Sequence, residues 1–406
     1  MSPPSHLLLL GTGPCAEWEH AMQRLAAASP LLLLDERPPT WQRPYLAAAR
    51  TASLLEPTQV LQVVQELANS HTIDGIMTFQ PAYQRAAALV RQELGLPGPD
   101  TKALQTCGAR HRTAAVLERA GIEGSSSLRA DSYQQALEAA HHVGFPLICK
   151  PDSPRRRYAA RTVSALPDLA EAFSAVTTAT WPGTGTVIEP LLDGLEATAY
   201  TYGTHSGTHV IALSHTTFDP AAEHALVPAE LVVDADDVCV TAIEASVSRA
   251  LAAVGLHTGP AQVRLRITAT GPRIISISPH LTDPLAAQLI EQVTGVDLVT
   301  ATAAHAVGHT ARIEPAPLGA MAVRYLHGTT ATAFSTTPDA AAPTPFIHVA
   351  HYDTEHRVGP LRRTGHVLVT GSDYPQCVAR LSSAGTHLRT PRLTAVTEDF
   401  SLRIMN

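Results

Sequence analysis

The sequence contains almost no lysine: of its 29 basic residues only Lys102 and Lys150 are lysine, and all the others are arginine. An arginine at a position where lysine is usual therefore says little about function in this chain. Each of the two lysines says more. Charged residues make up 16% of the chain and aromatic residues 5%, while hydrophobic residues reach 45%, as in a globular protein with an ample core. The net charge of -7 argues against a nucleic-acid partner.

Cysteine is also scarce, and the five residues of this type have neither C-x-x-C nor paired spacing. An odd, dispersed set argues against a disulfide framework and favours a reducing compartment. No Gly-x-Ser-x-Gly motif occurs, so serine hydrolase chemistry has no support. The cysteines are Cys15, Cys107, Cys149, Cys239 and Cys377.

Long apolar runs are missing as well. No segment has the length of a membrane span, and the run Leu7–Leu10 is too short for a signal peptide and follows no basic segment. We therefore expect a cytoplasmic protein without a membrane partner.

The first quarter of the chain alternates between strand and helix patterns, which predicts an open parallel sheet of the Rossmann-like kind. Fully apolar strands are expected where helices cover both faces of such a sheet. The predicted strands are His6–Leu10, Leu31–Leu34 and Gly75–Phe79, and the predicted helices are Ala16–Ala28, Pro57–Asn69 and Tyr83–Leu94.

The stretch Gly259–Pro284 predicts two strands joined by a turn at Thr270–Pro272. Residues two apart on a strand project to the same face, so an apolar face would lie behind a polar one. Polar faces on paired, apolar-backed strands indicate a cleft floor. The polar face would carry Arg264 and Arg266 on the first strand and Ser276, Ser278 and His280 on the second.

Two further motifs lie between these regions. G-F-P-L-I-C-K-P ends a buried strand at Lys150, and V-I-E-P-L-L-D-G-L-E places Glu189 seven residues before Glu196. Together with the helix end Leu117-x-x-x-Gly121, they resemble the ATP-grasp superfamily, in its carboxylate–amine ligase branch that contains dipeptide-forming enzymes. The resemblance covers most of the chain and implies an α/β ATP-grasp fold.

The resemblance implies four domains: an N-terminal α/β domain at 1–97, the two parts of the nucleotide-clamping domain at 98–183 and 184–312, and a small C-terminal domain at 313–406. It also implies ATP as cofactor. Lys150 would reach the α- and β-phosphates, Glu189 and Leu191 would lie at the hinge whose backbone holds adenine, and Glu196 would bind the ribose.

The sequence departs from the family's pattern mainly at the residues that bind phosphate and metal in that family. Arg110 stands where the family has its first nucleotide lysine, and the glycine-rich loop becomes Pro154, Arg156, Arg157 and Ala159. That loop needs glycine because its amides fold against phosphate oxygens. Arginines that could bind the anion instead are Arg155, Arg156, Arg157 and Arg161.

The family's metal ligands are exchanged too. Its two bridging glutamates become Arg264 and Ser276, its asparagine becomes Ser278, and its substrate-facing arginine becomes His280. Magnesium prefers hard oxygen ligands with carboxylates among them, and a guanidinium repels it. We therefore expect no metal at these positions, and assign any catalytic role to Arg264 and His280.

Two functions are consistent with these residues, and we favour the first. In the first, the chain is a pseudo-ligase that keeps the fold and acts by binding a ligand or a protein partner, which would be a second copy of the chain or an active paralogue. In the second, it is an active ATP-dependent ligase that joins a small amino or carboxylic acid to an amine, with arginines in place of the metal. A third reading, a basic cleft that holds an acidic small molecule for other chemistry, stays open.

Overall fold

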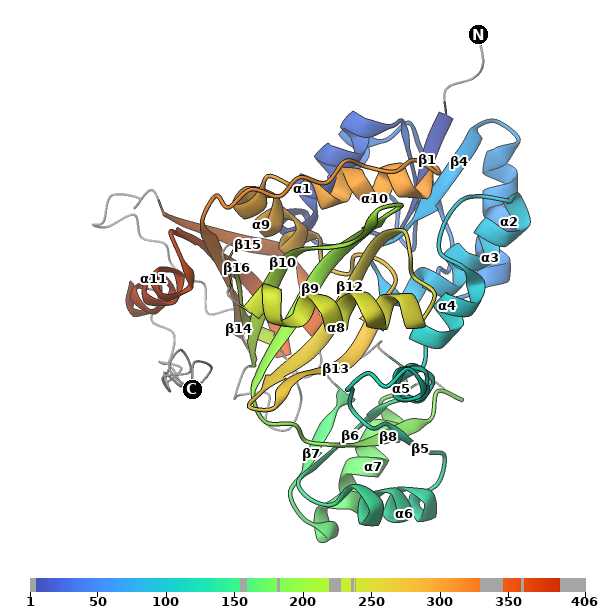
Figure 1. Cartoon of the computed structure of the whole chain (residues 1–406). Coiled ribbons are helices and arrows are strands. Elements are labelled where there is room, and N and C mark those ends of the chain that lie inside the picture. The colour runs from blue at the N-terminus through green and yellow to red at the C-terminus, as the bar shows by residue number, and fades with distance from the viewer. Residues whose placement is uncertain are drawn as a thin grey trace.

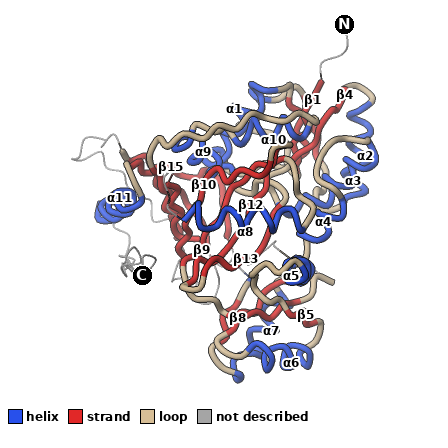
Figure 2. Tube along the Cα trace, in the orientation of Figure 1, coloured by secondary structure: helices blue, strands red, loops and turns tan. Residues whose placement is uncertain are grey.

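The computed structural model describes residues 5–153, 159–180, 183–218, 228–234, 237, 239–328, 346–358 and 361–387. These residues form three β-sheets with helices packed on their faces (Figures 1 and 2). In this part of the chain, no helix has both the length and the apolar character that a membrane span requires.

The N-terminal sheet is parallel, with strand order β3-β2-β1-β4. Leucines pair along β1 and β2, from Leu7 opposite Leu31 to Leu10 opposite Leu34, and all of them are buried. Helices on both faces explain why these strands are apolar throughout. The elements are β1 (Ser5–Leu10), α1 (Cys15–Ala28), β2 (Leu31–Asp35), β3 (Ala48–Thr51), α2 (Pro57–Ala68), β4 (Thr72–Met77) and α3 (Gln84–Leu94).

A small antiparallel sheet with strand order β5-β8-β6-β7 lies at the bottom of Figure 1. Leu147 and Cys149 of β6 face α6 and α7 in an apolar cluster, so alternation along the strand turns Lys150 to the opposite face. The elements are α4 (Thr101–Cys107), α5 (Arg110–Arg119), β5 (Leu128–Ala130), α6 (Tyr133–Val143), β6 (Leu147–Pro151), β7 (Arg161–Val163), α7 (Leu169–Thr178) and β8 (Thr186–Pro190).

The large sheet is antiparallel, with strand order β13-β12-β9-β10-β11-β14-β16-β15. Its elements are β9 (Leu195–Thr204), β10 (Gly207–Phe218), β11 (Pro228–Asp234), α8 (Cys239–Ala253), β12 (Gly259–Thr268), β13 (Gly271–Ser278), α9 (Pro284–Thr294), α10 (Leu298–Ala306), β14 (Ala320–Gly328), β15 (Ile347–Val358), β16 (Leu361–Gly371) and α11 (Tyr374–His387).

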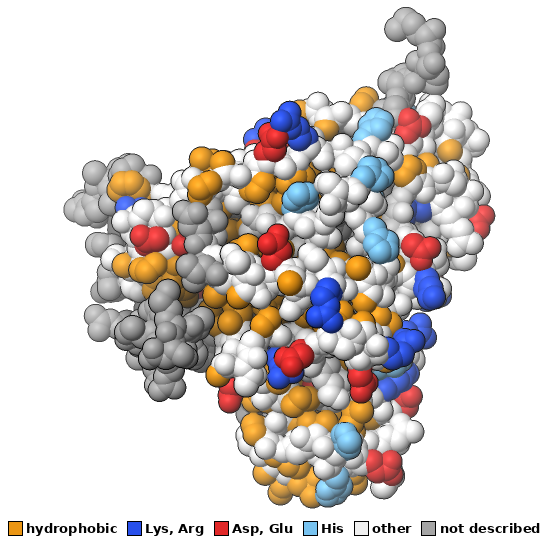
Figure 3. All heavy atoms as spheres, in the orientation of Figure 1, with side chains coloured by type: hydrophobic (Ala, Val, Ile, Leu, Met, Phe, Trp, Pro, Cys, Tyr) orange, Lys and Arg blue, Asp and Glu red, His pale blue; other side chains and the backbone are white. Residues whose placement is uncertain are grey.

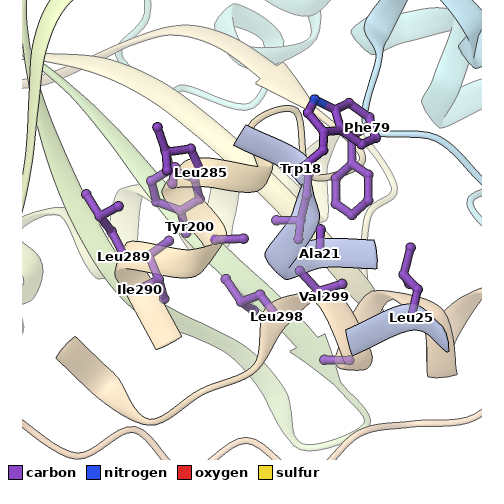
Figure 4. Packing of buried hydrophobic residues seen from close by; sticks show 14 of the residues in the cluster. Trp18, Ala21, Leu25, Phe79, Tyr200, Leu285, Leu289, Ile290, Leu298 and Val299 are labelled. Atoms are coloured by element: carbon purple, nitrogen blue, oxygen red, sulfur yellow. The ribbon is translucent and has the colours of Figure 1, made fainter. Parts of the chain in front are cut away.

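The largest apolar cluster joins the N-terminal sheet to the large sheet. Trp18 and Leu25 of α1 pack against α9 and α10, where Leu289 and Val299 lie (Figure 4). Trp18 also meets Phe79 edge to face at 5.4 Å between ring centroids. The strands of the predicted C-terminal domain, β14 to β16, continue the sheet that begins with β13 and β12. The domain bounds at 97, 183 and 312 stay predictions.

Candidate functional site

The hairpin of β12 and β13 has the pairing that the sequence predicts, with Arg264 directly opposite Ser276. Val263 and Leu265 are buried in the apolar cluster that includes α8. Alternation therefore projects Arg264 and Arg266 from the other face of the sheet. The register shifts between Arg264 and Leu265, where β13 has one extra residue, Ile275, as in a β-bulge.

Glu196 on β9 lies between the two arginines. Its Oε1 is 3.5 Å from Nε of Arg264, and its Oε2 is 3.5 Å from Nη2 of Arg266, the residue directly across on β12. Arg266 also donates from Nη1 to the carbonyl of Gly194 at 2.7 Å, which fixes the connection from β8 to β9. The Glu196 carboxylate is 4% exposed, so this ion pairing is largely shielded from water.

Lys150 and Glu189 form a second ion pair, on the small sheet. The Lys150 Nζ lies 2.5 Å from Oε2 of Glu189, and both side chains are buried. Ser125 donates to the same carboxylate at 2.7 Å, and Ser127 donates to its other oxygen. Every oxygen of this buried carboxylate therefore has a donor, as a buried charge requires.

Burial lowers the pKa of Lys150 to about 8, against the opposing attraction of Glu189 and with a further lowering from Arg110. Burial alone would raise the pKa of Glu189, but the nearby charges of Lys150 and Arg110 outweigh it, and the pKa is lowered. Glu196 also acts on the pKa of Lys150. The small sheet and the hairpin therefore turn these charges toward one another.

Arg110 begins α5 and is almost fully buried. Its Nε donates to the carbonyl of Pro151 at 3.1 Å and to that of Ser153 at 3.2 Å. These bonds hold the guanidinium beside the end of β6, next to Lys150. The charged side chains of this candidate site are four cations, Arg110, Lys150, Arg264 and Arg266, and two carboxylates, Glu189 and Glu196, so the group carries two more positive than negative charges. On the face shown in Figure 3, Lys and Arg side chains also gather around α5.

The remaining predicted residues that the structure describes lie on or next to β7, β8 and β13. Leu191 donates its backbone N–H to the carbonyl of Pro146 at 3.1 Å, and Arg161 donates from Nη1 to the carbonyl of Ala160 at 2.9 Å. His280 is half-buried just beyond β13. Arg155, Arg156 and Arg157 lie outside the described residues.

A magnesium ion does not fit the donor set of the hairpin. Ser276 and Ser278 offer neutral hydroxyls, Arg264 offers a cation, and the nearby acid Glu196 already has two guanidinium partners. Magnesium instead requires several hard oxygen ligands, with carboxylates compensating its charge. Among the described residues, no three His, Cys, Asp or Glu side chains are grouped to hold a metal ion. Lys150 and Arg110, in contrast, are of the type that binds phosphate oxygens.

Sequence reasoning missed the partners of these charges. It did not predict that Ser125 and Ser127 would bind Glu189, nor that Arg266 would bind Glu196. Ser125 and Ser127 lie more than sixty residues before Glu189, so no local pattern links them. The Arg-x-Arg spacing on a polar strand face was the one available signal for Arg266.

No family model matches the chain. A curated relative, the uncharacterized protein y4rH of Sinorhizobium fredii, is 24% identical over 266 residues, which are 63% of this chain. The match spans about half the length of that relative, 54%.

Solved structures match nearly the whole chain. The L-amino acid ligase of Bacillus licheniformis has a TM-score of 0.73 and 16% identity, with 95% of this chain and 98% of that one covered. N5-carboxyaminoimidazole synthetase of Staphylococcus aureus, complexed with ADP, has a TM-score of 0.73 and 15% identity, covering 94% and 96%. Biotin carboxylase of Campylobacter jejuni has a TM-score of 0.72 and 14% identity, covering 94% and 91%. The chain therefore has the ATP-grasp fold, as its sequence predicts.

Proposed function

We propose that this protein is a pseudo-ligase: an ATP-grasp protein that binds the phosphates of a nucleotide without a divalent ion and acts through binding rather than amide-bond formation. One observation carries the proposal, the pairing of Glu196 with Arg264 and Arg266 on the hairpin. Glu196, an acid beside the exchanged metal ligand Arg264, already has two guanidinium partners, Arg264 and Arg266.

The size of the repulsion between a guanidinium and a divalent ion supports the proposal. Before the opposing attraction of Glu196 is counted, a divalent ion about 4 Å from a single guanidinium is disfavoured by roughly 8 kcal/mol at an effective dielectric constant near 20. Removing the Glu196 carboxylate from its arginines would add the cost of leaving buried charges unpaired. Hydroxyl ligands from Ser276 and Ser278 do not offset either cost.

The cations of the candidate site have the chemistry to bind a metal-free polyanion. Arginine binds phosphate in a planar, bidentate arrangement and lysine binds it as a point charge. We assign these contacts to Arg110 and Lys150, with Arg264 and Arg266 closing the other side. Lys150 is mostly protonated, and so positively charged, at neutral pH because its pKa is about 8. The ligand-bound form would then act on a protein partner, either a second copy of the chain or an active paralogue.

A second candidate function is an active ATP-dependent ligase that joins small amino or carboxylic acids. The buried Lys150–Glu189 pair beside Arg110 is compatible with this function too, because an active ligase would hold its ATP phosphates with the same cations. In that case the arginines of the hairpin would neutralise charge on the transferred phosphoryl group, and an amine would trap the acyl phosphate.

Product formation separates the two functions. Purified protein is incubated with ATP, magnesium and mixtures of amino acids, and ADP release is measured alongside calorimetric ATP binding in EDTA. The pseudo-ligase predicts binding in EDTA and no ADP above the protein-free control. Amino-acid-dependent ADP release would establish the active ligase instead.

A further inference from the structure

Asp152, two residues after Lys150, links the end of β6 to α5, the helix that Arg110 begins. Its side chain is fully buried and accepts hydrogen bonds from two other elements. From α5, the backbone N–H of His111 donates to Oδ1 at 3.0 Å, and the His111 ring binds Oδ2 through Nδ1. From β5, Nη1 of Arg129 donates to Oδ2 at 3.0 Å.

Arg110 makes the reverse contact, in which a side chain of α5 donates to the backbone at the end of β6. Its Nε donates to the carbonyls of Pro151 and Ser153, the two residues that flank Asp152. The first turn of α5 and the end of β6 therefore bind each other twice, once through a guanidinium on backbone oxygens and once through a carboxylate on a backbone N–H. Asp152 is further fixed by its own N–H, which donates to the carbonyl of Gly185 at 3.0 Å.

This arrangement matters because Arg110 would otherwise have two roles, to hold α5 against β6 and to bind phosphate. Without Asp152, the contact between α5 and β6 described here would rest on the Nε bonds of Arg110, and a phosphate that attracts the guanidinium would compete with them. The bonds of Arg110 and those of Asp152 all involve an ionised group, but only the Asp152 bonds are independent of the guanidinium that a phosphate would attract. The Asp152 carboxylate leaves the guanidinium of Arg110 in place beside Lys150 while a ligand binds.

We propose that Asp152 is a positioning residue, which acts through Arg110 and Lys150 by holding the first turn of α5 against the end of β6. This inference rests on the proposed function for its effect on ligand affinity. The effect on Lys150 itself is independent of any ligand.

The chain offers a matched control in Asp131. Its carboxylate binds the same arginine, with Oδ1 2.8 Å from Nη2 of Arg129, but it is exposed and has no bond to α5 in the described contacts. Asp152→Asn and Asp131→Asn therefore remove the same charge from the same Arg129 neighbourhood, and only the first changes a hydrogen-bond acceptor of α5.

The first measurement uses the rarity of lysine. Protein labelled with ¹³C only in lysine gives two sets of side-chain signals, from Lys102 and Lys150. In Asp152→Ala and Asp152→Asn the Lys150 signal is expected to shift and its titration midpoint to rise, because Arg110 moves away and water enters. The Lys102 signal, and both signals in Asp131→Asn, are expected to stay unchanged. An unmoved Lys150 signal in both Asp152 variants would overturn the inference.

The second measurement is a double-mutant cycle on binding of ATP in EDTA. Asp152→Ala is expected to weaken binding about 10- to 100-fold in the wild-type background and less than threefold in Arg110→Ala. A purely structural role predicts the same factor in both backgrounds, which would contradict positioning. If wild-type protein binds no ATP, the proposed function fails, and the Lys150 signal alone then decides the role of Asp152.

Discussion

Arg264 on β12 lies against Glu196 on β9, with its Nε 3.5 Å from the carboxylate oxygen Oε1. Arg266 approaches the other oxygen of the same carboxylate at 3.5 Å. Both oxygens of the Glu196 carboxylate, which could otherwise bind a nucleotide or a metal ion, thus have arginine counter-ions within the sheet. The balance of charge among these residues is therefore the first property to test.

Replacing Glu196 by Gln should strengthen binding of metal-free ATP by about three- to tenfold, because it removes the carboxylate that competes with phosphate for the two arginines. Glu123→Gln is the matched control, since Glu123 pairs with Arg273 of the same hairpin at 3.0 Å but is itself exposed. Calorimetry in EDTA measures both. Weaker binding in Glu196→Gln would instead support the ribose contact that the family resemblance implies for Glu196.

Restoring the family's ligands should restore a metal site. The triple change Arg264→Glu, Ser276→Glu and Ser278→Asn supplies two carboxylates and an amide oxygen on one face of the hairpin. We expect ATP binding to become dependent on magnesium by at least tenfold. Ser278→Asn alone, which adds no charge, is the control. If the ATP affinity of the triple variant is the same with and without magnesium, these positions do not converge on the nucleotide.

The protonation of Lys150 should govern the pH dependence of anion binding. Because burial lowers its pKa to about 8, ATP affinity is expected to fall as the pH rises from 7 to 9.5. Glu189 opposes that lowering, so Glu189→Gln should move the fall to lower pH. Lys150→Arg should bind ATP equally at both pH values because arginine stays charged. Calorimetry at pH 7 and 9.5 measures the ATP affinity of the wild type and of both variants. A wild-type affinity that is unchanged at pH 9.5 would exclude a role for the Lys150 charge in anion binding.

His366 on β16 should make the protein sensitive to acid. Burial lowers its pKa to about 4, and its Nδ1 lies 3.1 Å from the hydroxyl of Tyr352, which also binds Glu17 of α1. The unfolded chain takes up this proton near pH 6.5 and the folded chain only near pH 4. The free energy of unfolding should therefore drop by about 3 kcal/mol as the pH falls through that window.

Urea unfolding at pH 7 and pH 4.5 measures that drop in wild type and in His366→Gln. The difference between the two proteins isolates the histidine from the carboxylates that also titrate. His205→Gln, in the exposed turn between β9 and β10, is the control. Equal pH dependence in wild type and His366→Gln would contradict the assignment.

Much of the fold could be predicted from periodicity. The leucine strands β1 and β2 and the hairpin of β12 and β13 have strong apolar patterns, and the structure has them at nearly the predicted bounds. The short edge strand β3, Ala48–Thr51, went unpredicted because it has two alanines and two polar residues and is half exposed. Its pairing with β2, rather than its own pattern, makes it a strand.

The candidate site was predictable in its residues and not in their pairing. Lys150, Glu189 and Glu196 stand out by motif, and alternation alone places Arg264 and Arg266 on one face. That Arg266 lies directly opposite Glu196 depends on strand register, which is set by long-range packing. Asp152 carries no signal beyond its place after Lys150, because its partners His111 and Arg129 come from two other elements.

The response of ATP affinity to free magnesium tests the central claim most directly. Calorimetry of ATP binding is carried out in EDTA and at increasing free magnesium up to several millimolar. A site that neutralises phosphates with guanidinium groups should lose affinity as magnesium sequesters the nucleotide, so the apparent Kd should rise. An apparent Kd that falls with magnesium would contradict the account, and the protein would then be a metal-dependent nucleotide enzyme.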